Sequence, residues 1–349
     1  MEFLVIDYRH PVFSIVMLLL LVAAVALANH WWGVLRRRDQ ERKLSRFLSR
    51  FEAEKRAKDY KDVLKVQPDS VDSLLLLASI YYKSGEYNEA MRIYLALLDI
   101  LAEKSIRVDV MTLLGRTYHK AGFFQRSRDI LLESLKIKAR NPEALELLLV
   151  IYEQMREYAK ALEVLEALEE LDRNVQKERA FVMASHAVHN AALSDEKKEQ
   201  ALLQLWEQYP FLSRQVLEFL FAHNPQAAWR HVNNERARLV ADLFWYLPKE
   251  KFDENEALKH PFLAELYSAK GWVNATQKSA IFELDILIQL GSKRSIATLE
   301  FEHLCGRCLA TYPLYFHRCP NCFAVGSART EPVLAQNTGG DLEVSASFH

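Results

Sequence analysis

The stretch VDSLLLLASIYYKSGEYNEAMRIY, residues 71–94, carries apolar side chains at helical spacing on both sides of a single glycine. Leucine, alanine and tyrosine recur three or four residues apart before Gly85 and again after it, which predicts two amphipathic helices. Glycine tolerates the left-handed conformation that commonly ends a helix. We therefore expect a helical hairpin that turns at Gly85.

The same pattern returns twice further along the chain. Registers that start at Val71, Val108 and Pro142 share a small residue at position 8, an aromatic at 11, glycine at 15 and a small residue at 20. The matching residues are Ala78, Tyr81, Gly85 and Ala90, then Gly115, Tyr118, Gly122 and Ser127, then Leu149, Tyr152, Arg156 and Ala161. Leu149 and Arg156 depart from the pattern and make the third copy the loosest.

These copies resemble the tetratricopeptide repeat, a pair of antiparallel helices with a period of 34 residues. We expect three clear repeats over residues 71–175, then degenerate helical repeats over 176–300 with one eroded copy starting at Ala257. Prolines that should separate helices stand at Pro210, Pro225, Pro248 and Pro261. The expected fold is all-α, and a solenoid of this kind has a concave face that binds peptides or partner proteins.

Catalytic signatures are missing from the sequence. It contains no P-loop, no G-x-G-x-x-G, no H-E-x-x-H and no G-x-S-x-G motif, so we expect neither an enzyme nor a small-molecule substrate. His186 and His189 are three residues apart and could share a metal, but no third ligand lies near them in the sequence. We interpret this pair as ordinary helix surface.

The N-terminal region predicts a membrane anchor. Between Val12 and Ala28 the only polar residue is Ser14, and a helix over residues 12–35 is long enough to cross a bilayer. The alternative is a cleaved signal peptide, but the leader before this segment lacks the positive charge that such a peptide needs. Residues 1–35 are therefore expected to form a single-pass anchor.

A basic run follows the anchor. Residues 36–56 contain nine Lys or Arg against four acids, and residues 36–70 are expected to form a juxtamembrane helical segment. Positive flanks stay in the cytoplasm, so we expect the N-terminus outside and the bulk of the chain inside, at a cytoplasmic membrane. The counter-charge of the run is then anionic lipid, and nucleic acid is not an expected partner.

All four cysteines of the chain lie between residues 305 and 322. Cys305, Cys308, Cys319 and Cys322 form two C-x2-C pairs separated by ten residues. A reducing cytoplasm disfavours disulfides, and this spacing suits two knuckles that hold one tetrahedral metal ion. Four thiolates leave no position for a substrate, so iron or zinc here is expected to have a structural role, although iron could also carry an electron.

We place the metal-binding module at residues 301–326 and expect residues 327–349 to be a flexible tail, because small and polar residues dominate them. One anchor, a tetratricopeptide array and a terminal C-x2-C-x10-C-x2-C resemble the lipopolysaccharide assembly protein B (LapB) family along nearly the whole chain. In that family the module is called rubredoxin-like. Leu309 and Phe323 depart from the pattern, because knuckles of this type favour glycine there.

The resemblance implies that Cys305, Cys308, Cys319 and Cys322 bind one iron or zinc ion. It also implies a non-enzymatic adaptor at the inner membrane, which helps the membrane protease FtsH to degrade the lipid A deacetylase and gathers lipopolysaccharide-synthesis proteins. Two alternatives stay open. One is a general tetratricopeptide scaffold with other clients, and the other is a rubredoxin-like electron-transfer protein.

Overall fold

The computed structural model describes residues 71–337, which fall into two compact units that divide after Ala102. The expected membrane anchor, the basic segment over 36–70 and the end of the expected tail, residues 338–349, lie outside the described residues. None of the helices within 71–337 is long and apolar enough to cross a membrane.

The first unit contains one helix pair, α3 (Val71–Lys83) and α4 (Tyr87–Ile100). The second begins with two further pairs, α5 (Lys104–Lys120) with α6 (Phe124–Ile137) and α7 (Pro142–Gln154) with α8 (Tyr158–Glu169). The three predicted repeats are therefore three helical hairpins, and the helices of each hairpin pack on each other.

The turns of the hairpins explain the residue at position 15. Gly85, Gly122 and Arg156 have φ values of 85°, 82° and 59°, so all three lie in the left-handed region. In each turn the next backbone N–H donates to a carbonyl five residues back, for example Phe123 N to Tyr118 O at 2.8 Å. Arg156 adopts the turn without the freedom of glycine, which costs about 1–2 kcal/mol.

In the second hairpin, the small residues at positions 8 and 20, Gly115 and Ser127, let α5 and α6 pack closely. A Cβ added to Gly115 would lie 2.8 Å from the Leu131 side chain, closer than packed carbon atoms tolerate. Ser127 donates a hydrogen bond of 2.6 Å across the pair to the Gly115 carbonyl. The helices α5 and α6 could not pack this closely around a larger residue.

The region over 176–290 is helical, but its helices shorten. They are α9 (Gln176–His189), α10 (Asp195–Gln208), α11 (Ser213–His223), α12 (Pro225–His231), α13 (Asn234–Leu239), α14 (Ala241–Trp245), α15 (Glu254–Ala257), α16 (Pro261–Lys270) and α17 (Phe282–Leu290), with short 3-10 turns η2 (Pro210–Leu212), η3 (Lys249–Lys251) and η4 (Gly291–Ile296). All four predicted prolines lie at the start of a helix or immediately before one, which confirms them as breaks. The helix of the eroded copy ends at Gly271, in the left-handed conformation at φ 81°.

The all-α prediction is wrong for the C-terminal part. A three-stranded antiparallel sheet in the order β2-β1-β3 is formed by β1 (Ala297–Cys305), β2 (Thr311–Tyr312) and β3 (Ala328–Gln336). Side chains of β1 alternate inward and outward, with Leu299, Phe301, His303 and Cys305 buried. This period of two is the pattern of a half-buried strand rather than of a helix.

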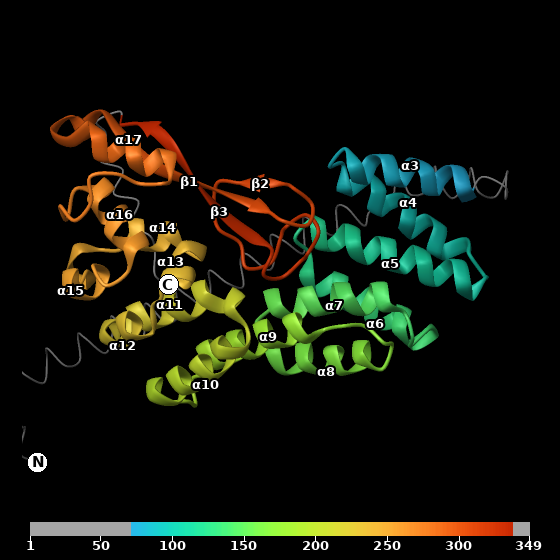
Figure 1. The fold of residues 1–349 in the computed structure, drawn as a ribbon. Helices are drawn as coiled ribbons and strands as arrows, with labels where there is room; N and C mark the ends of the chain where they lie inside the picture. The colour runs from blue at the N-terminus through green and yellow to red at the C-terminus, as the bar shows by residue number, and fades with distance from the viewer. Residues whose placement is uncertain (1–70, 338–349) are drawn as a thin grey trace, which may run out of the picture. The chain divides into compact units, whose positions relative to one another are not determined.

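The predicted boundaries of the module are therefore also wrong. The segment 328–336, expected to be part of a flexible tail, pairs along its whole length with β1, from Cys305 opposite Ala328 to Ala297 opposite Gln336. It is an edge strand, which is why it can contain Pro332. We call residues 297–336 the four-cysteine module, and Figure 1 shows it beside α14 of the same unit.

Candidate metal centre and inner-face groove

The four cysteines come together at one end of the module. Their sulfur atoms all lie within 4.8 Å of one another. Cys305 Sγ is 3.7 Å from Cys322 Sγ, and Cys308 Sγ is 3.6 Å from Cys319 Sγ. A tetrahedron with zinc–sulfur bonds of about 2.3 Å has edges of about 3.8 Å, so the arrangement fits one metal ion.

Two equivalent knuckles hold the sulfur atoms. In the first, the N–H of Leu309 donates to Cys305 O at 2.9 Å, and the N–H of Cys305 donates to Ala310 O at 2.9 Å. The second knuckle repeats both bonds, from Phe323 to Cys319 at 2.9 Å and from Cys319 to Ala324 at 3.0 Å. The sequence spacing alone predicted this pair of knuckles.

The residue after the second cysteine of each knuckle keeps the backbone conformation of a glycine. Leu309 and Phe323 have φ values of 60° and 57°, the left-handed conformation for which glycine is favoured. The backbone path is kept, and two side chains are added at the surface of the cage. Leu309 is exposed, whereas Phe323 contacts a helix of the array.

Hydrogen bonds and burial shift the pKa values of two of the thiols in opposite directions. Burial raises the pKa of the Cys305 thiol, but hydrogen bonds from the Ser327 hydroxyl and from the N–H groups of Cys308 and Arg307 outweigh it and lower that pKa to about 6. Burial raises the pKa of Cys322 to about 12. A metal cation supplies the positive charge that lets all four thiols ionise together.

The cage has four protein ligands and no free position, so it suits a structural ion better than a reactive one. Iron and zinc both accept four thiolates in this geometry. The residues thus fit the expected metal, and the arrangement does not distinguish the two.

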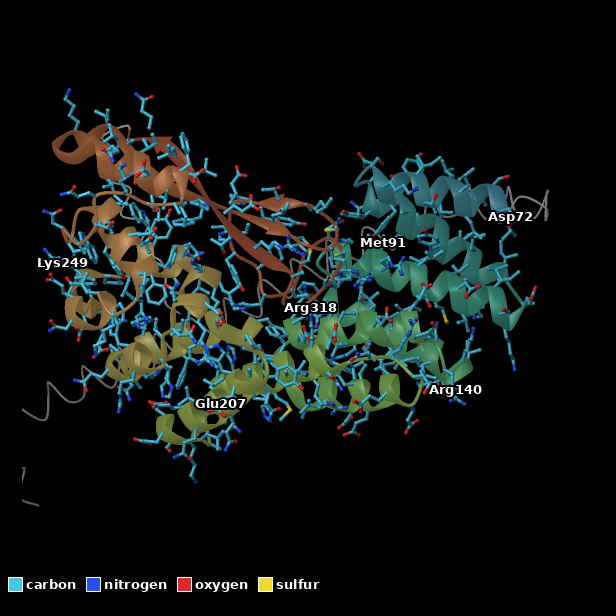
Figure 2. The ribbon with its side chains drawn as sticks, in the orientation of Figure 1. Asp72, Met91, Arg140, Glu207, Lys249 and Arg318 are labelled. Atoms are coloured by element: carbon cyan, nitrogen blue, oxygen red, sulfur yellow. The ribbon has the colours of Figure 1, made fainter. Side chains whose placement is uncertain are left out.

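The module is docked on the helical array by a buried ion pair. Arg318, one residue before Cys319, donates from Nε to Glu153 Oε2 at 2.6 Å, and its side chain and that of Glu153 are only 12% and 7% exposed. Figure 2 places Arg318 where the module meets the helices. Burial raises the pKa of Glu153 against the opposing effect of Arg318, so this carboxylate depends on the guanidinium for its charge.

Further contacts surround this pair. Lys120 at the end of α5 donates to Pro320 O at 3.0 Å, and the ring of Phe323 lies edge-on to His119 at 5.5 Å. A Cβ on Gly326 would lie 2.6 Å from Phe211, so the module and the array approach too closely there for any larger residue. The module therefore packs on the array in one defined position.

A second polar cluster lies where the module meets α11 and α14. Arg214 donates from Nε to Glu218 at 2.6 Å and also binds Asp242. The Tyr315 ring of the module stacks on the Arg214 guanidinium at 4.3 Å. Burial lowers the pKa of His303, and burial lowers the pKa of His317 to about 4.

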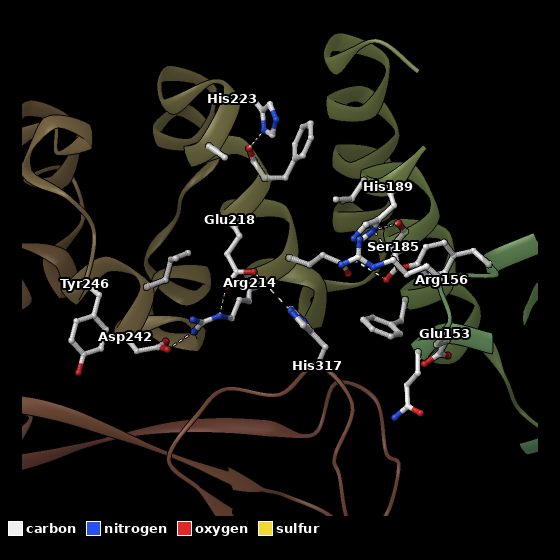
Figure 3. Close-up of a pocket in the computed structure, with 18 residues that line it drawn as sticks. Glu153, Arg156, Ser185, His189, Arg214, Glu218, His223, Asp242, Tyr246 and His317 are labelled. Atoms are coloured by element: carbon white, nitrogen blue, oxygen red, sulfur yellow. Dashed lines mark hydrogen bonds and ion pairs between the residues drawn. The ribbon is translucent and has the colours of Figure 1, made fainter. Parts of the chain in front are cut away.

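Between the module and the array lies a groove of about 770 Å³, which we call the inner-face groove. It is lined by the first helices of successive pairs, α7, α9 and α11, together with α14 and His317 of the module, as Figure 3 shows. Aromatic walls come from Tyr158, Phe181, Phe219 and Tyr246. A smaller groove of about 490 Å³ continues past Arg318 towards α5.

The histidine pair singled out in the sequence does not form a metal site. His189 Nδ1 lies 2.8 Å from the Ser185 carbonyl and 3.3 Å from the Tyr158 hydroxyl, and its ring stands beside that of Tyr158. Within residues 71–337, the only cluster of three or more potential metal ligands is the four cysteines. His189 instead lines the inner-face groove.

Comparison with known proteins supports the helical repeats. Two segments, residues 73–107 and residues 142–175, match the tetratricopeptide repeat. Both segments are therefore tetratricopeptide repeats. No curated protein sequence matches the chain significantly.

Solved tetratricopeptide structures resemble it in part. YrrB, described as a TPR protein with an unusual peptide-binding site, is 15% identical with a TM-score of 0.35, over 49% of this chain and 88% of YrrB. A tetratricopeptide repeat protein from Parabacteroides merdae ATCC 43184 is 16% identical with a TM-score of 0.38, over 67% of this chain and 91% of that one.

Proposed function

We propose that the protein is a non-enzymatic adaptor whose inner-face groove binds partner polypeptides. The observation that carries this proposal is the groove itself, which is formed by α7 of a tetratricopeptide pair, by α9, α11 and α14, and by His317 of the four-cysteine module. Its walls are aromatic and polar, which suits the side chains of a peptide. No catalytic family is indicated by the comparisons.

The metal in this proposal is a structural ion held by Cys305, Cys308, Cys319 and Cys322. When bound, it fixes the two knuckles and with them the positions of Arg318 and Phe323, the two residues that flank the second knuckle and contact the array. The ion thus acts on the groove through the shape of the module. A closed cage favours this role over catalysis.

We further propose that the partners belong to lipopolysaccharide synthesis at the inner membrane, and that the adaptor promotes FtsH-dependent degradation of the lipid A deacetylase. The support is the order of the parts, an apolar N-terminal segment, tetratricopeptide repeats and a four-cysteine module, which resembles the LapB family. Tethering beside a membrane protease would raise the effective concentration of a bound client without any new contact.

Depletion of the protein should lengthen the half-life of the lipid A deacetylase several-fold and raise the amount of lipopolysaccharide. The half-life is measured after translation is stopped, by immunoblot of the deacetylase in depleted and undepleted cells. A variant that lacks residues 1–35 should fail to restore the short half-life, because it no longer shares the membrane with the protease.

An unchanged half-life on depletion, in cells that do regulate the deacetylase by proteolysis, would reject this client and leave a general tetratricopeptide scaffold. A half-life restored in full by the variant without residues 1–35 would reject the tethering.

Topology provides a separate expectation. A phosphatase that is active only outside the cytoplasm should be inactive when fused after His349, whereas a fluorescent protein that folds in the cytoplasm should be bright at the same position. The reason is the run Arg36–Arg38, which favours the cytoplasmic side. Phosphatase activity would show that the orientation is opposite to the expected one. The cysteines would then lie outside the reducing environment that favours a metal over disulfides.

A further inference from the structure

The outer edge of β3 is open within the described part of the chain. Ser327 O accepts from the Gly306 N–H at 2.7 Å, and the Asn337 N–H donates to Ile296 O at 3.0 Å, so pairing with β1 continues past both ends of β3. Backbone groups alternate between the two sides of an antiparallel strand, so the even-numbered residues of β3 direct theirs away from β1. None of these outward groups bonds to another residue between 71 and 337.

An apolar cavity lies beside this edge. Its volume is about 360 Å³, and it borders β3 at Thr330, Glu331 and Pro332. An apolar cavity of about 150 Å³ is enough to hold benzene, so an aromatic side chain fits here. Helix α17 packs on both long strands of the sheet (Figure 1). The other walls of the cavity are mostly apolar and include Phe262, Leu266, Ile281, Leu284, Leu299 and Phe301.

The sequence that follows β3 has the pattern of a hairpin. Residues 338–341 read Thr-Gly-Gly-Asp, and paired glycines between two strands are a turn signal. Residues 342–348 read Leu-Glu-Val-Ser-Ala-Ser-Phe, in which apolar and polar side chains alternate strictly, as in a half-buried strand. This stretch is equal in length to residues 330–336 of β3.

We infer that residues 342–348 pair with the open edge of β3 as a fourth strand and that Phe348 fills the cavity. The alternation sets the register, because the apolar residues reach the core face only when they stand opposite even-numbered residues of β3. The shortest loop of that parity, residues 338–340, pairs Leu342 with Gln336 and Phe348 with Thr330. These two β3 residues direct their backbone groups outward, and Thr330 borders the cavity.

Pro332 decides between the chain's own segment and a strand from another molecule. It has no N–H, so the pair that it forms with Ala346 lacks one of its hydrogen bonds. A partner's strand would lose the same bond and would also lose its freedom of movement on binding. Residues 342–348 are joined to β3 by a few residues, so their effective concentration at the edge is high. The edge therefore favours the segment of this chain.

Hydrogen exchange followed by mass spectrometry tests this inference. The full-length chain, purified in a mild non-ionic detergent, is compared with a synthetic peptide of residues 338–349. Amides of residues 342–348 should exchange at least about tenfold more slowly in the protein than in the peptide, because a paired strand exchanges only when it opens locally. The protection should be independent of protein concentration, since the pairing is within one chain.

Two substitutions of adjacent residues form a matched pair. Phe348→Asp would place a charge in the apolar cavity, so exchange of residues 342–348 should return to the rate of the peptide. Ser347→Asp places the same charge on the opposite, solvent-facing side of the strand and should leave the protection unchanged. Removal of residues 338–349 should speed exchange of residues 330–336, because their outward groups lose their partners.

Exchange of residues 342–348 at the rate of the peptide in the unmodified protein would overturn the inference. Equal effects of Phe348→Asp and Ser347→Asp would also overturn it, because a strand places these two side chains on opposite sides. Protection that disappears on dilution would show exchange of strands between two copies instead. None of these results depends on the inner-face groove or on the deacetylase, so the inference and the proposed function can fail separately.

Discussion

Cys319→Ser is expected to release the metal and to unfold the four-cysteine module. The wild-type protein should contain about one iron or zinc ion per chain, and the variant should contain none, because the cage needs all four thiolates. Metal binding is also folding energy for so small a unit, so the free energy of unfolding should fall by more than about 4 kcal/mol. Elemental analysis measures the ion, and urea titration measures the stability.

The matched control is Arg307→Ser, which introduces serine into the first knuckle without touching a sulfur atom. The Arg307 side chain is exposed, so metal content and stability should stay at wild-type values. Wild-type protein prepared without chelator that contains no metal would contradict the cage. A red, reversibly reducible iron form with a redox partner in the cell would favour the electron-transfer alternative.

Arg318→Ala is expected to lower the free energy of unfolding by about 3–5 kcal/mol, the usual cost of removing one partner of a buried ion pair. Glu153, at 7% exposure, would then be either charged without a partner or protonated, and both states cost stability. The metal should stay bound, because no sulfur ligand is changed. Urea titration and elemental analysis of the same sample separate loss of docking from loss of the ion.

The loss should depend on pH in a defined direction. Burial raises the pKa of Glu153 even with Arg318 present, and removal of Arg318 raises it further. A group whose pKa is raised on folding destabilises the folded state as the pH rises through that pKa, so the loss should be smaller at acidic pH and should grow as the pH rises.

An exposed ion pair on the same array provides the comparison. Arg116 and Glu143 are 3.2 Å apart, but their side chains are 39% and 65% exposed, so Arg116→Ala should cost less than about 1 kcal/mol. The double variant Arg318→Met, Glu153→Gln should recover much of the loss, since it buries no unpaired charge. Equal costs for Arg318→Ala and Arg116→Ala would show that Arg318 does not hold the module in place.

The helical hairpins and the knuckles could be predicted because both depend on neighbours in the sequence. Apolar residues three or four apart define the faces of α3 to α8, and the positions of Gly85, Gly122 and Arg156 locate the turns. Likewise, a C-x2-C spacing brings two sulfur atoms to one side of a turn whatever surrounds it. Even the left-handed conformation of Leu309 and Phe323 follows from their place after the second cysteine.

The strand β3 could not be predicted, because its stability comes from a partner. Its residues are mostly small or polar and include Pro332, so in isolation they suggest a tail. Hydrogen bonds to β1, whose own sequence alternates clearly, stabilise this segment as a strand. The all-α expectation missed β1, although the alternation of its side chains can be read in the sequence, and the sequence does not indicate which segments pair with it.

The sequence by itself determined the repeats, the left-handed turns and the set of four cysteines. Only the tertiary structure decided where the module sits, since Arg318 and Glu153 are 165 residues apart and each looks like an ordinary surface charge in its local context. The inner-face groove likewise combines α7, α9, α11 and α14 with His317. Whether a charge is buried and paired depends on which distant surfaces come into contact. The local sequence pattern carries no information about that contact.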